Sequence, residues 1–200
     1  MLDRSSESME PKVAPFRREL VAGLSGRVVE VGAGNGVSFA YYPPTVDVVI
    51  AVEPEPYLRE KAAEKAAEAP VAIDVRDGLA DSLPLEDASV DAAVVSQVLC
   101  TVPDIGRAVA ELRRVLKPDG EVRFLEHVRS DKPGKARLQR WMDRARIQPT
   151  FAGGCHCGRD IVGDLEASGL RIEQIRTVTV GPSWLHTNPH VLGRAAFESV

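Results

Sequence analysis

The segment from Val28 to Gly36, which reads Val-Val-Glu-Val-Gly-Ala-Gly-Asn-Gly, constrains the fold of this chain more than any other. Its β-branched residues are typical of a buried strand, and Gly32, Gly34 and Gly36 then predict a tight turn. Glycine accepts positive φ and has no Cβ, so the backbone N–H groups of such a turn can approach a ligand closely. The segment therefore predicts a strand that ends at a ligand-binding turn.

Strand-like and helix-like segments alternate on both sides of this turn, and the connections between strands are too long for hairpins. This pattern predicts an α/β fold with a doubly wound, mainly parallel, seven-stranded Rossmann-like sheet and helices on both faces. The last two strands are expected to pair antiparallel at the sheet edge. We expect strands at 27–31, 46–52, 71–75, 90–99, 121–125, 171–180 and 191–197, and helices at 13–24, 37–42, 54–69, 105–116, 138–145 and before 169. Turns or loops are expected at 76–88, 118–120 and 150–158.

Length and charge narrow the range of partners. Two hundred residues suit one domain, which we place at 11–200, after a tail at 1–10 that has few apolar residues and is expected to be mobile. With 25 basic and 29 acidic residues, the net charge of -4 predicts no nucleic-acid or membrane partner and favours a small-molecule one. No apolar run approaches the ~20 residues of a membrane span, so we expect a cytoplasmic protein. The oligomeric state is left open.

The acids around the glycines narrow the ligand class. A dinucleotide fingerprint wants a third glycine at position 37, where this chain has Val37. Glu30 precedes the turn and is suited to orienting it or to receiving a cationic amine. Glu53 follows the second predicted strand, where an acid can accept hydrogen bonds from both ribose hydroxyls. These residues favour an adenosine ligand with a cationic amine over NAD, which remains an alternative.

These residues resemble the class I S-adenosylmethionine (SAM)-dependent methyltransferases. The likeness runs over roughly 28–127 and includes Leu83-Pro84-Leu85, Ser89-Val90-Asp91 and the segment from Glu111 to Gly120. More narrowly, the chain resembles the methyltransferase-like group that includes alkyl thiol methyltransferases. That likeness is carried by Tyr42-Pro43-Pro44, Val98-Leu99-Cys100, Leu125-Glu126-His127-Val128, Gly154-Cys155-His156 with Arg159, and Pro189-His190 with Gly193.

The resemblance implies a set of residues that bind SAM. The glycine turn would surround the methionine portion, Glu53 would hold the ribose diol, and the loop 79–81 would line the adenine. An acid often precedes the alanine of that loop, but this chain has Leu79, so Asp81, Asp77 or backbone would meet the adenine amine. The full set of candidate cofactor residues is Glu30, Gly32, Ala33, Gly34, Asn35, Gly36, Glu53, Pro54, Leu79, Ala80, Asp81, Ser96 and Gln97.

The candidate catalytic residues lie near two later segments. Glu126 and His127 end a predicted strand, where either could bind the acceptor or take its proton, although a strand-end acid can equally cap a neighbouring helix. His156 could act as a base, with Arg159 as an anion or orienting contact. Its flanking cysteines are too close in sequence for the usual zinc knuckle, so we expect no metal and no disulfide framework. Cys100 is expected to be a small buried hydrophobe.

Together these observations predict an enzyme that transfers the methyl group of SAM to a small acceptor, with a thiol as one candidate. Methyl transfer from a sulfonium needs in-line approach and exclusion of water, so a dedicated base is not required. The alternatives are an oxygen, nitrogen or carbon acceptor, an NAD-dependent oxidoreductase, and a non-catalytic protein that retains the cofactor site.

Overall fold

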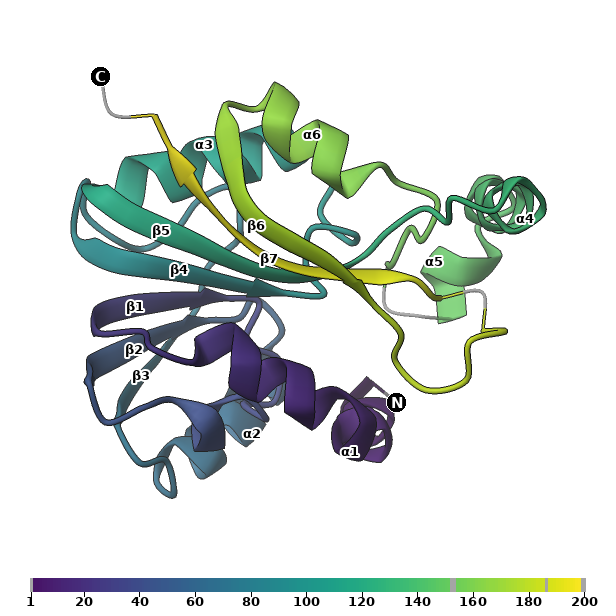
Figure 1. The fold of residues 1–200 in the computed structure, drawn as a ribbon. Coiled ribbons are helices and arrows are strands. Elements are labelled where there is room, and N and C mark those ends of the chain that lie inside the picture. The colour runs from purple at the N-terminus through teal and green to yellow at the C-terminus, as the bar shows by residue number, and fades with distance from the viewer. Residues whose placement is uncertain (1, 152–153, 186, 199–200) are drawn as a thin grey trace.

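A seven-stranded sheet forms the centre of the protein in this computed structural model, which describes residues 2–151, 154–185 and 187–198 (Figure 1). The strand order is β3-β2-β1-β4-β5-β7-β6. The first five strands are parallel, and β7 runs antiparallel to both of its neighbours. The predicted sheet and its antiparallel edge are therefore confirmed. The strands are β1 (Gly26–Val31), β2 (Val46–Val52), β3 (Ala72–Arg76), β4 (Val90–Ser96), β5 (Leu116–His127), β6 (Leu170–Val178) and β7 (His190–Phe197).

Helices cover both faces of the sheet. Figure 1 shows α3 and α6 on one face and α1 and α2 on the other. Each face has its own apolar core, because the central strands are buried on both sides and read as nearly continuous apolar runs. The helices are α1 (Leu2–Val21), the 3₁₀ helix η1 (Phe39–Tyr41), α2 (Pro56–Ala66), α3 (Ile105–Val115), α4 (Pro133–Arg144), α5 (Ile147–Phe151) and α6 (Ile161–Ala167).

The first helix begins earlier than its apolar pattern predicts. It includes the residues from Leu2 onward, which were expected to form an unstructured tail. The Glu10 carboxylate accepts hydrogen bonds from Arg17 Nε at 3.1 Å and from the Tyr41 hydroxyl at 2.9 Å. These contacts tie the end of the expected tail to the folded protein, and apolar periodicity does not report such polar tertiary contacts.

Two connections also differ from the prediction. The strand β5 begins at Leu116 and continues through the Pro118-Asp119-Gly120 segment that was expected to be a turn. Leu116 pairs with Val90 and Glu121 with Ala92, so the register shifts across the residues that the turn chemistry had marked. The predicted loop at 150–158 begins within the short helix α5.

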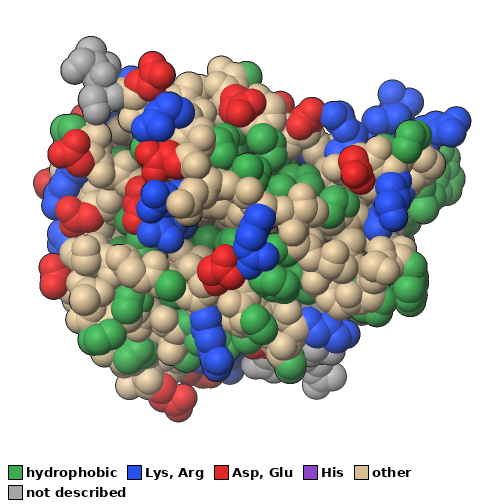
Figure 2. Space-filling view, in the orientation of Figure 1, with side chains coloured by type: hydrophobic (Ala, Val, Ile, Leu, Met, Phe, Trp, Pro, Cys, Tyr) green, Lys and Arg blue, Asp and Glu red, His purple; other side chains and the backbone are tan. Residues whose placement is uncertain are grey.

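The strand order locates the ligand crevice. The chain leaves β1 toward β2 on one side of the sheet and reaches β4 on the other, so the connections diverge at the carboxyl end of β1. None of the described helices is long and apolar enough to span a membrane. On the face in Figure 2, basic and acidic side chains are interspersed, and Lys and Arg gather over α4.

We expect Gly193→Ala to destabilise the protein because β7 packs tightly on β5 and β6 at this residue. A Cβ on Gly193 would lie 2.5 Å from the backbone oxygen of Gln174 and 2.6 Å from Phe124 Cζ. Overpacking of this kind costs about 1 to 3 kcal/mol of unfolding free energy, measured by urea denaturation. Gly134→Ala is the matched control, since a Cβ there meets nothing within 4 Å. Equal stability of the two variants would contradict this account of the sheet edge.

Candidate active site

The glycine turn is fixed to the end of β2 and leaves space above itself. The N–H groups of Gly32 and Ala33 donate to the Val52 carbonyl at 2.8 and 3.1 Å. A Cβ on Gly32 would lie 2.4 Å from Val98 Cγ2, so the turn touches the segment that follows β4. A Cβ on Gly34, at φ +57°, would meet nothing within 4 Å. The turn is therefore packed on one side and open on the other, as a ligand cradle must be.

Glu53 lies beside this open side. Its Oε2 accepts the N–H of Gly34 at 2.8 Å, and its Oε1 accepts the N–H of Glu55 at 3.0 Å. An ionised carboxylate has about four acceptor positions, so two bonds to the backbone leave room for two hydroxyl donors. Glu53 is nevertheless only 6% exposed. This geometry fits the ribose diol of SAM that the sequence predicts for this residue.

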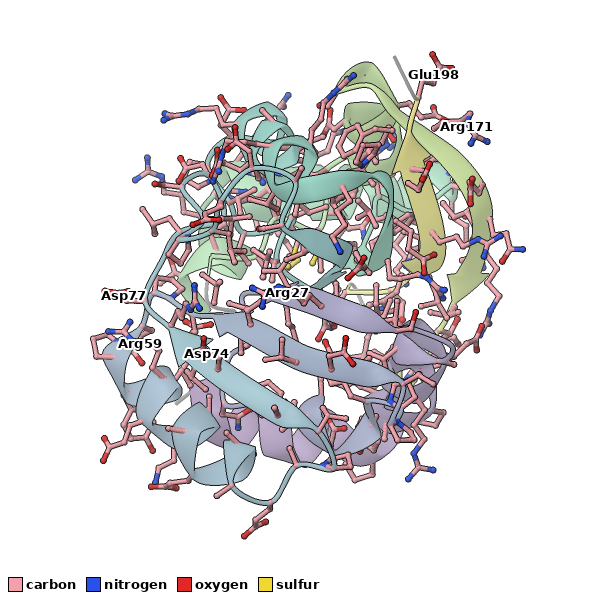
Figure 3. The ribbon with its side chains drawn as sticks, turned by 90° about the vertical axis from the view of Figure 1, so that its left-hand side faces the viewer. Arg27, Arg59, Asp74, Asp77, Arg171 and Glu198 are labelled. Carbon is pink, nitrogen blue, oxygen red and sulfur yellow. The ribbon has the colours of Figure 1, made fainter. Side chains whose placement is uncertain are left out.

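Arg59 holds the loop that follows Glu53. Its Nη1 donates to the carbonyls of Glu53 and Pro54 at 2.9 and 2.6 Å, and to Asp77 Oδ1 at 2.9 Å. Figure 3 shows Arg59 and Asp77 side by side. Because Asp77 already pairs with Arg59, this acid positions the loop between the ends of β2 and β3.

Glu30 is buried under the turn, and Tyr42 donates a hydrogen bond to its Oε2 at 3.0 Å. Burial raises the pKa of Glu30, and hydrogen bonds from Ser38 and Tyr42, together with the charge of Arg17, oppose that rise. Glu30 thus sits in a polar pocket, and its two predicted roles, orienting the turn and receiving a cationic amine, stay predictions.

Arg17 is a site residue that the sequence analysis missed. It is 8% exposed, and its Nη1 donates to the hydroxyls of Ser38 at 3.1 Å and Ser96 at 3.2 Å. The residue thereby brings a positive charge from α1 to the carboxyl end of β4. The sequence does hold one indication of this role. Arg17 lies next to Phe16 of the apolar stripe of the first helix, and a cation buried there needs a polar partner.

The residues expected to line the adenine and the methionine end lie at the same edge of the sheet. Leu79 is 54% exposed and forms an isolated bridge with Ser82, and Asp81 lies 3.9 Å from Arg107 Nε. Gln97 directly follows β4 and has a positive φ of 60°, an unusual conformation for a residue with a side chain. Its Nε2 lies 3.4 Å from His190 Nε2 on β7. The antiparallel edge therefore reaches the predicted methionine end of the pocket.

Glu126 binds backbone rather than pointing to open space. This fully buried carboxylate accepts the N–H groups of Val98, Leu99 and Cys100 at 2.8, 3.0 and 3.3 Å. Burial raises the pKa of Glu126 to about 7, against the effect of these hydrogen bonds. In the structure Glu126 therefore acts as a positioning residue for the turn after β4, whereas the sequence left open an acceptor contact, a proton acceptor or a helix cap.

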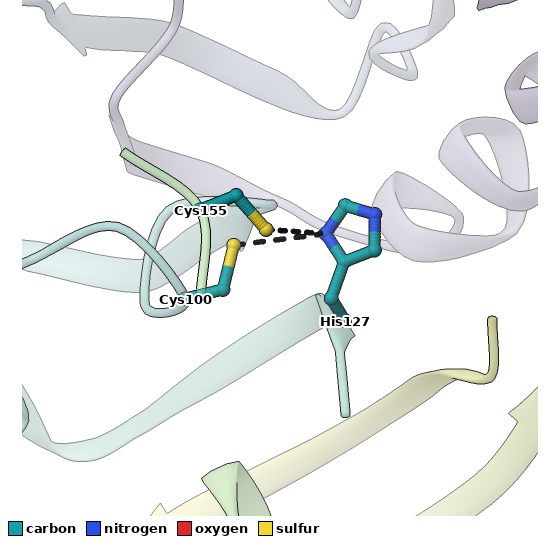
Figure 4. Close-up of side chains that lie close together, drawn as sticks. All are labelled: Cys100, His127 and Cys155. Carbon is teal, nitrogen blue, oxygen red and sulfur yellow. Dashed lines mark hydrogen bonds between the residues drawn. The ribbon is translucent and has the colours of Figure 1, made fainter. Parts of the chain in front are cut away.

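His127 lies among thiols that are far apart in the sequence. Its Nδ1 is 3.6 Å from both Cys100 Sγ and Cys155 Sγ, and Cys155 Sγ is 3.5 Å from Cys157 Sγ (Figure 4). Hydrogen bonding from the Cys100 and Cys157 thiols lowers the pKa of Cys155, whereas hydrogen bonding to Cys155 and burial raise the pKa of Cys100. Cys100 is buried as predicted, but it belongs to a polar cluster that sequence spacing could not show.

The His156 segment is fixed against the same turn. The N–H of His156 donates to the Cys100 carbonyl at 2.8 Å, and Arg159 Nη1 donates to the carbonyls of Leu99 and Val102 at 2.9 and 2.6 Å. Arg159 therefore contacts backbone here, and its role as an anion or orienting contact stays a prediction. The structure brings His127 and the His156 segment together around the turn that follows β4.

Comparison with known proteins bears on the family of this chain. Residues 29–124 match a family described as a methyltransferase domain. The chain is 32% identical to thiol S-methyltransferase TMT1B of Rattus norvegicus, over 96% of this chain and 81% of that protein. It is 33% identical to the ubiquinone/menaquinone biosynthesis C-methyltransferase UbiE of Methylobacterium nodulans, over 82% of this chain and 60% of that protein.

A solved structure with the same fold extends the comparison. It is a SAM-dependent methyltransferase of Thermotoga maritima, described as a possible histamine N-methyltransferase. The two chains superpose with a TM-score of 0.71 at 22% identity, over 98% of this chain and 94% of that one. This likeness supports the fold over the whole chain, including its last third.

We expect Glu53→Ala to weaken SAM binding by roughly tenfold to a hundredfold, because hydrogen bonds to a charged group contribute about 1.5 to 3 kcal/mol. Isothermal titration calorimetry with SAM and with its demethylated product measures the loss. Glu60→Ala on the exposed face of α2 is the control and should bind as the wild type does. Unchanged affinity in the Glu53 variant would remove Glu53 from the cofactor site.

Proposed function

The chain belongs to the SAM-dependent methyltransferases, and we propose that its methyl acceptor is a small thiol. The observation that carries this proposal is the extent of the match to the rat thiol S-methyltransferase. That match covers 96% of this chain, whereas the shared methyltransferase domain ends at residue 124. The similarity therefore includes the C-terminal third, which surrounds the carboxyl ends of β4 and β5 and is the part of the chain best placed to select an acceptor.

Three charged residues are suited to the polar groups of SAM. Glu53 has two acceptor positions left for the ribose diol, and Glu30 supplies negative charge under the turn for the methionine amine. Arg17 supplies positive charge next to Ser96, where the methionine carboxylate would need it. When bound, SAM supplies a methyl group made electrophilic by its sulfonium. The chain's own part is to hold both reactants in line and away from water.

A thiol acceptor does not require a catalytic base. A small thiol has a pKa of about 8.5 and is partly ionised at neutral pH, so it can attack without a dedicated base. The catalytic roles predicted for His156, Glu126 and His127 as proton acceptors are then unnecessary for this substrate class.

The other candidates carry less support. Relatives named for carbon and for nitrogen methylation keep both acceptors as alternatives, and this chain spans only 60% of the carbon-specific one. Family membership argues against the oxidoreductase and non-catalytic alternatives. The cytoplasmic location and the absence of a nucleic-acid partner stay predictions from the sequence.

The acceptor class is tested with matched substrates. We expect the protein to methylate phenylmethanethiol faster than phenylmethanol or phenylmethylamine by on the order of a hundredfold in kcat/KM. The reason is that a thiol is a few per cent ionised at pH 7 whereas an alcohol is not. Mass spectrometry of the methylated product measures each rate. Turnover confined to oxygen, nitrogen or carbon acceptors would exclude the thiol.

The role of Arg17 is tested separately. Arg17→Gln should raise the dissociation constant for SAM by roughly tenfold or more through the loss of a charge-assisted contact, and should leave the KM for the acceptor unchanged. Arg18→Gln, at an exposed position of α1, is the control for the loss of a charge from this helix. Circular dichroism confirms that both variants fold. If Arg17 were only structural, through its contacts with Glu10 and Ser38, the substitution would lower stability. The Kd for SAM would then not rise separately from the KM for the acceptor.

A further inference from the structure

The thiol and imidazole cluster at the end of β5 has the composition of a metal site. Cys100 Sγ, Cys155 Sγ and His127 Nδ1 all lie within 4.8 Å of one another (Figure 4). They come from three separate segments: the turn after β4, the last residue of β5 and the loop before α6. No metal was expected from the sequence, because Cys155 and Cys157 are too close for the usual zinc knuckle and Cys100 lies on a predicted strand. The fold brings Cys100 and His127 next to Cys155.

The spacing of these atoms matches tetrahedral coordination. Bonds of about 2.3 Å for Zn–S and about 2.0 to 2.1 Å for Zn–N place a sulfur and a nitrogen ligand about 3.5 to 3.6 Å apart. The two observed separations between sulfur and His127 Nδ1 are both 3.6 Å. A zinc ion could therefore be held by His127 and each cysteine without a change in these two distances. Thiolates with imidazole are the ligands that zinc prefers.

The supports of the cluster are those that metal ligands require. The N–H of Cys100 donates to the buried Glu126 carboxylate, and its carbonyl accepts the N–H of His156, so the turn that carries the first sulfur is held at both ends. The His127 ring packs against the His190 ring, with centroids 4.2 Å apart. These contacts fix the positions of two of the ligands before a metal binds.

The cluster also lies next to the cofactor pocket. Cys100 is three residues after Gln97, so their Cα atoms are at most about 11 Å apart. Between them, Val98 is in contact with Gly32 of the glycine turn, and Gln97 reaches His190, which packs on His127. A group bound to the cluster would therefore lie near the methionine end, where the methyl group is transferred.

We propose that Cys100, Cys155 and His127 bind Zn²⁺ and that the fourth position of the metal takes the acceptor thiolate. This inference rests on the proposed thiol function. Three protein ligands with an open position are the usual arrangement of a catalytic zinc site. Cys157 is near Cys155 but is not among the three atoms that lie together, so we assign it a hydrogen bond to Cys155 and not a metal bond.

In the proposed step the acceptor thiol loses its proton to solvent as its sulfur binds the metal. A lone pair of that sulfur then forms a bond to the methyl carbon, while the bond between this carbon and the sulfonium sulfur breaks and its electron pair stays on the departing sulfur. The products are the methyl thioether and the demethylated cofactor. The metal would lower the pKa of the bound thiol, and the oxidation state of the zinc would not change during the transfer.

Cobalt substitution tests the metal site without reference to activity. Untagged, reduced protein is titrated with Co²⁺, and we expect one equivalent to produce the visible bands of tetrahedral cobalt and a sulfur-to-cobalt charge-transfer band. Zn²⁺ should abolish these bands by competition. Addition of phenylmethanethiol should then increase the charge-transfer band of the cobalt protein as a further sulfur binds. A wild-type protein that shows no such bands would overturn the proposal.

Substitutions identify the ligands. Cys100→Ser, Cys155→Ser and His127→Ala should abolish the cobalt bands and lower kcat/KM for the thiol by at least about a hundredfold. The matched control, Cys157→Ser, should keep the bands. Calorimetry with SAM shows that each variant remains folded. If Cys157→Ser also lost the bands, Cys157 would be a fourth ligand. The site would then be closed, and the proposed open position for the acceptor would be overturned.

The outcomes separate this inference from the proposed function. Full thiol turnover by metal-free protein would overturn the role of the metal and leave the thiol acceptor standing. A metal-loaded protein whose cobalt bands ignore added thiol, and which methylates only oxygen, nitrogen or carbon acceptors, would overturn both.

Discussion

The hydrogen bonds from three successive backbone N–H groups to the buried Glu126 carboxylate are the interaction on which the active site depends. They hold the turn of residues 98–100 against the end of β5. Val98 in that turn touches Gly32, and Cys100 touches His127. One carboxylate thus connects the glycine turn with the sulfur cluster. An unpartnered N–H group or carboxylate at this depth would be costly, so the arrangement leaves little freedom to the turn.

The cofactor end of the pocket is organised by a second carboxylate in the same manner. Glu53 joins the glycine turn after β1 to the start of the segment after β2. Both acids use backbone N–H groups as partners, and backbone positions are set by the sheet rather than by flexible side chains. The two carboxylates differ in the hydrogen bonds that they can still accept. Glu53 accepts two backbone N–H groups and lies beside the open side of the glycine turn, whereas Glu126 accepts three and is enclosed. One carboxylate is therefore available to a ligand and the other is structural.

Local chemistry explains which parts of the fold were predictable. The second strand was predicted at its observed bounds, because a β-branched run between proline and glutamate has few other structures open to it. The start of α1 and the Pro118-Asp119-Gly120 segment were predicted wrongly. Each place has a tertiary contact that local preference does not predict: Glu10 accepts a hydrogen bond from Tyr41, and Leu116 pairs with Val90 before the register shifts.

The sequence alone determined the doubly wound fold, the glycine turn and the acid at the end of the second strand, because strand and helix periodicity and glycine chemistry are local properties. Only the tertiary structure decided that Arg17 reaches Ser96, that Glu126 faces backbone, and that Cys100 and His127 join Cys155. Each of these contacts joins segments distant in the sequence. Glu126 and His127 meet the turn after β4 because β4 and β5 are parallel neighbours that end at the same edge of the sheet. The spacing of residues along the chain does not predict contacts of this kind.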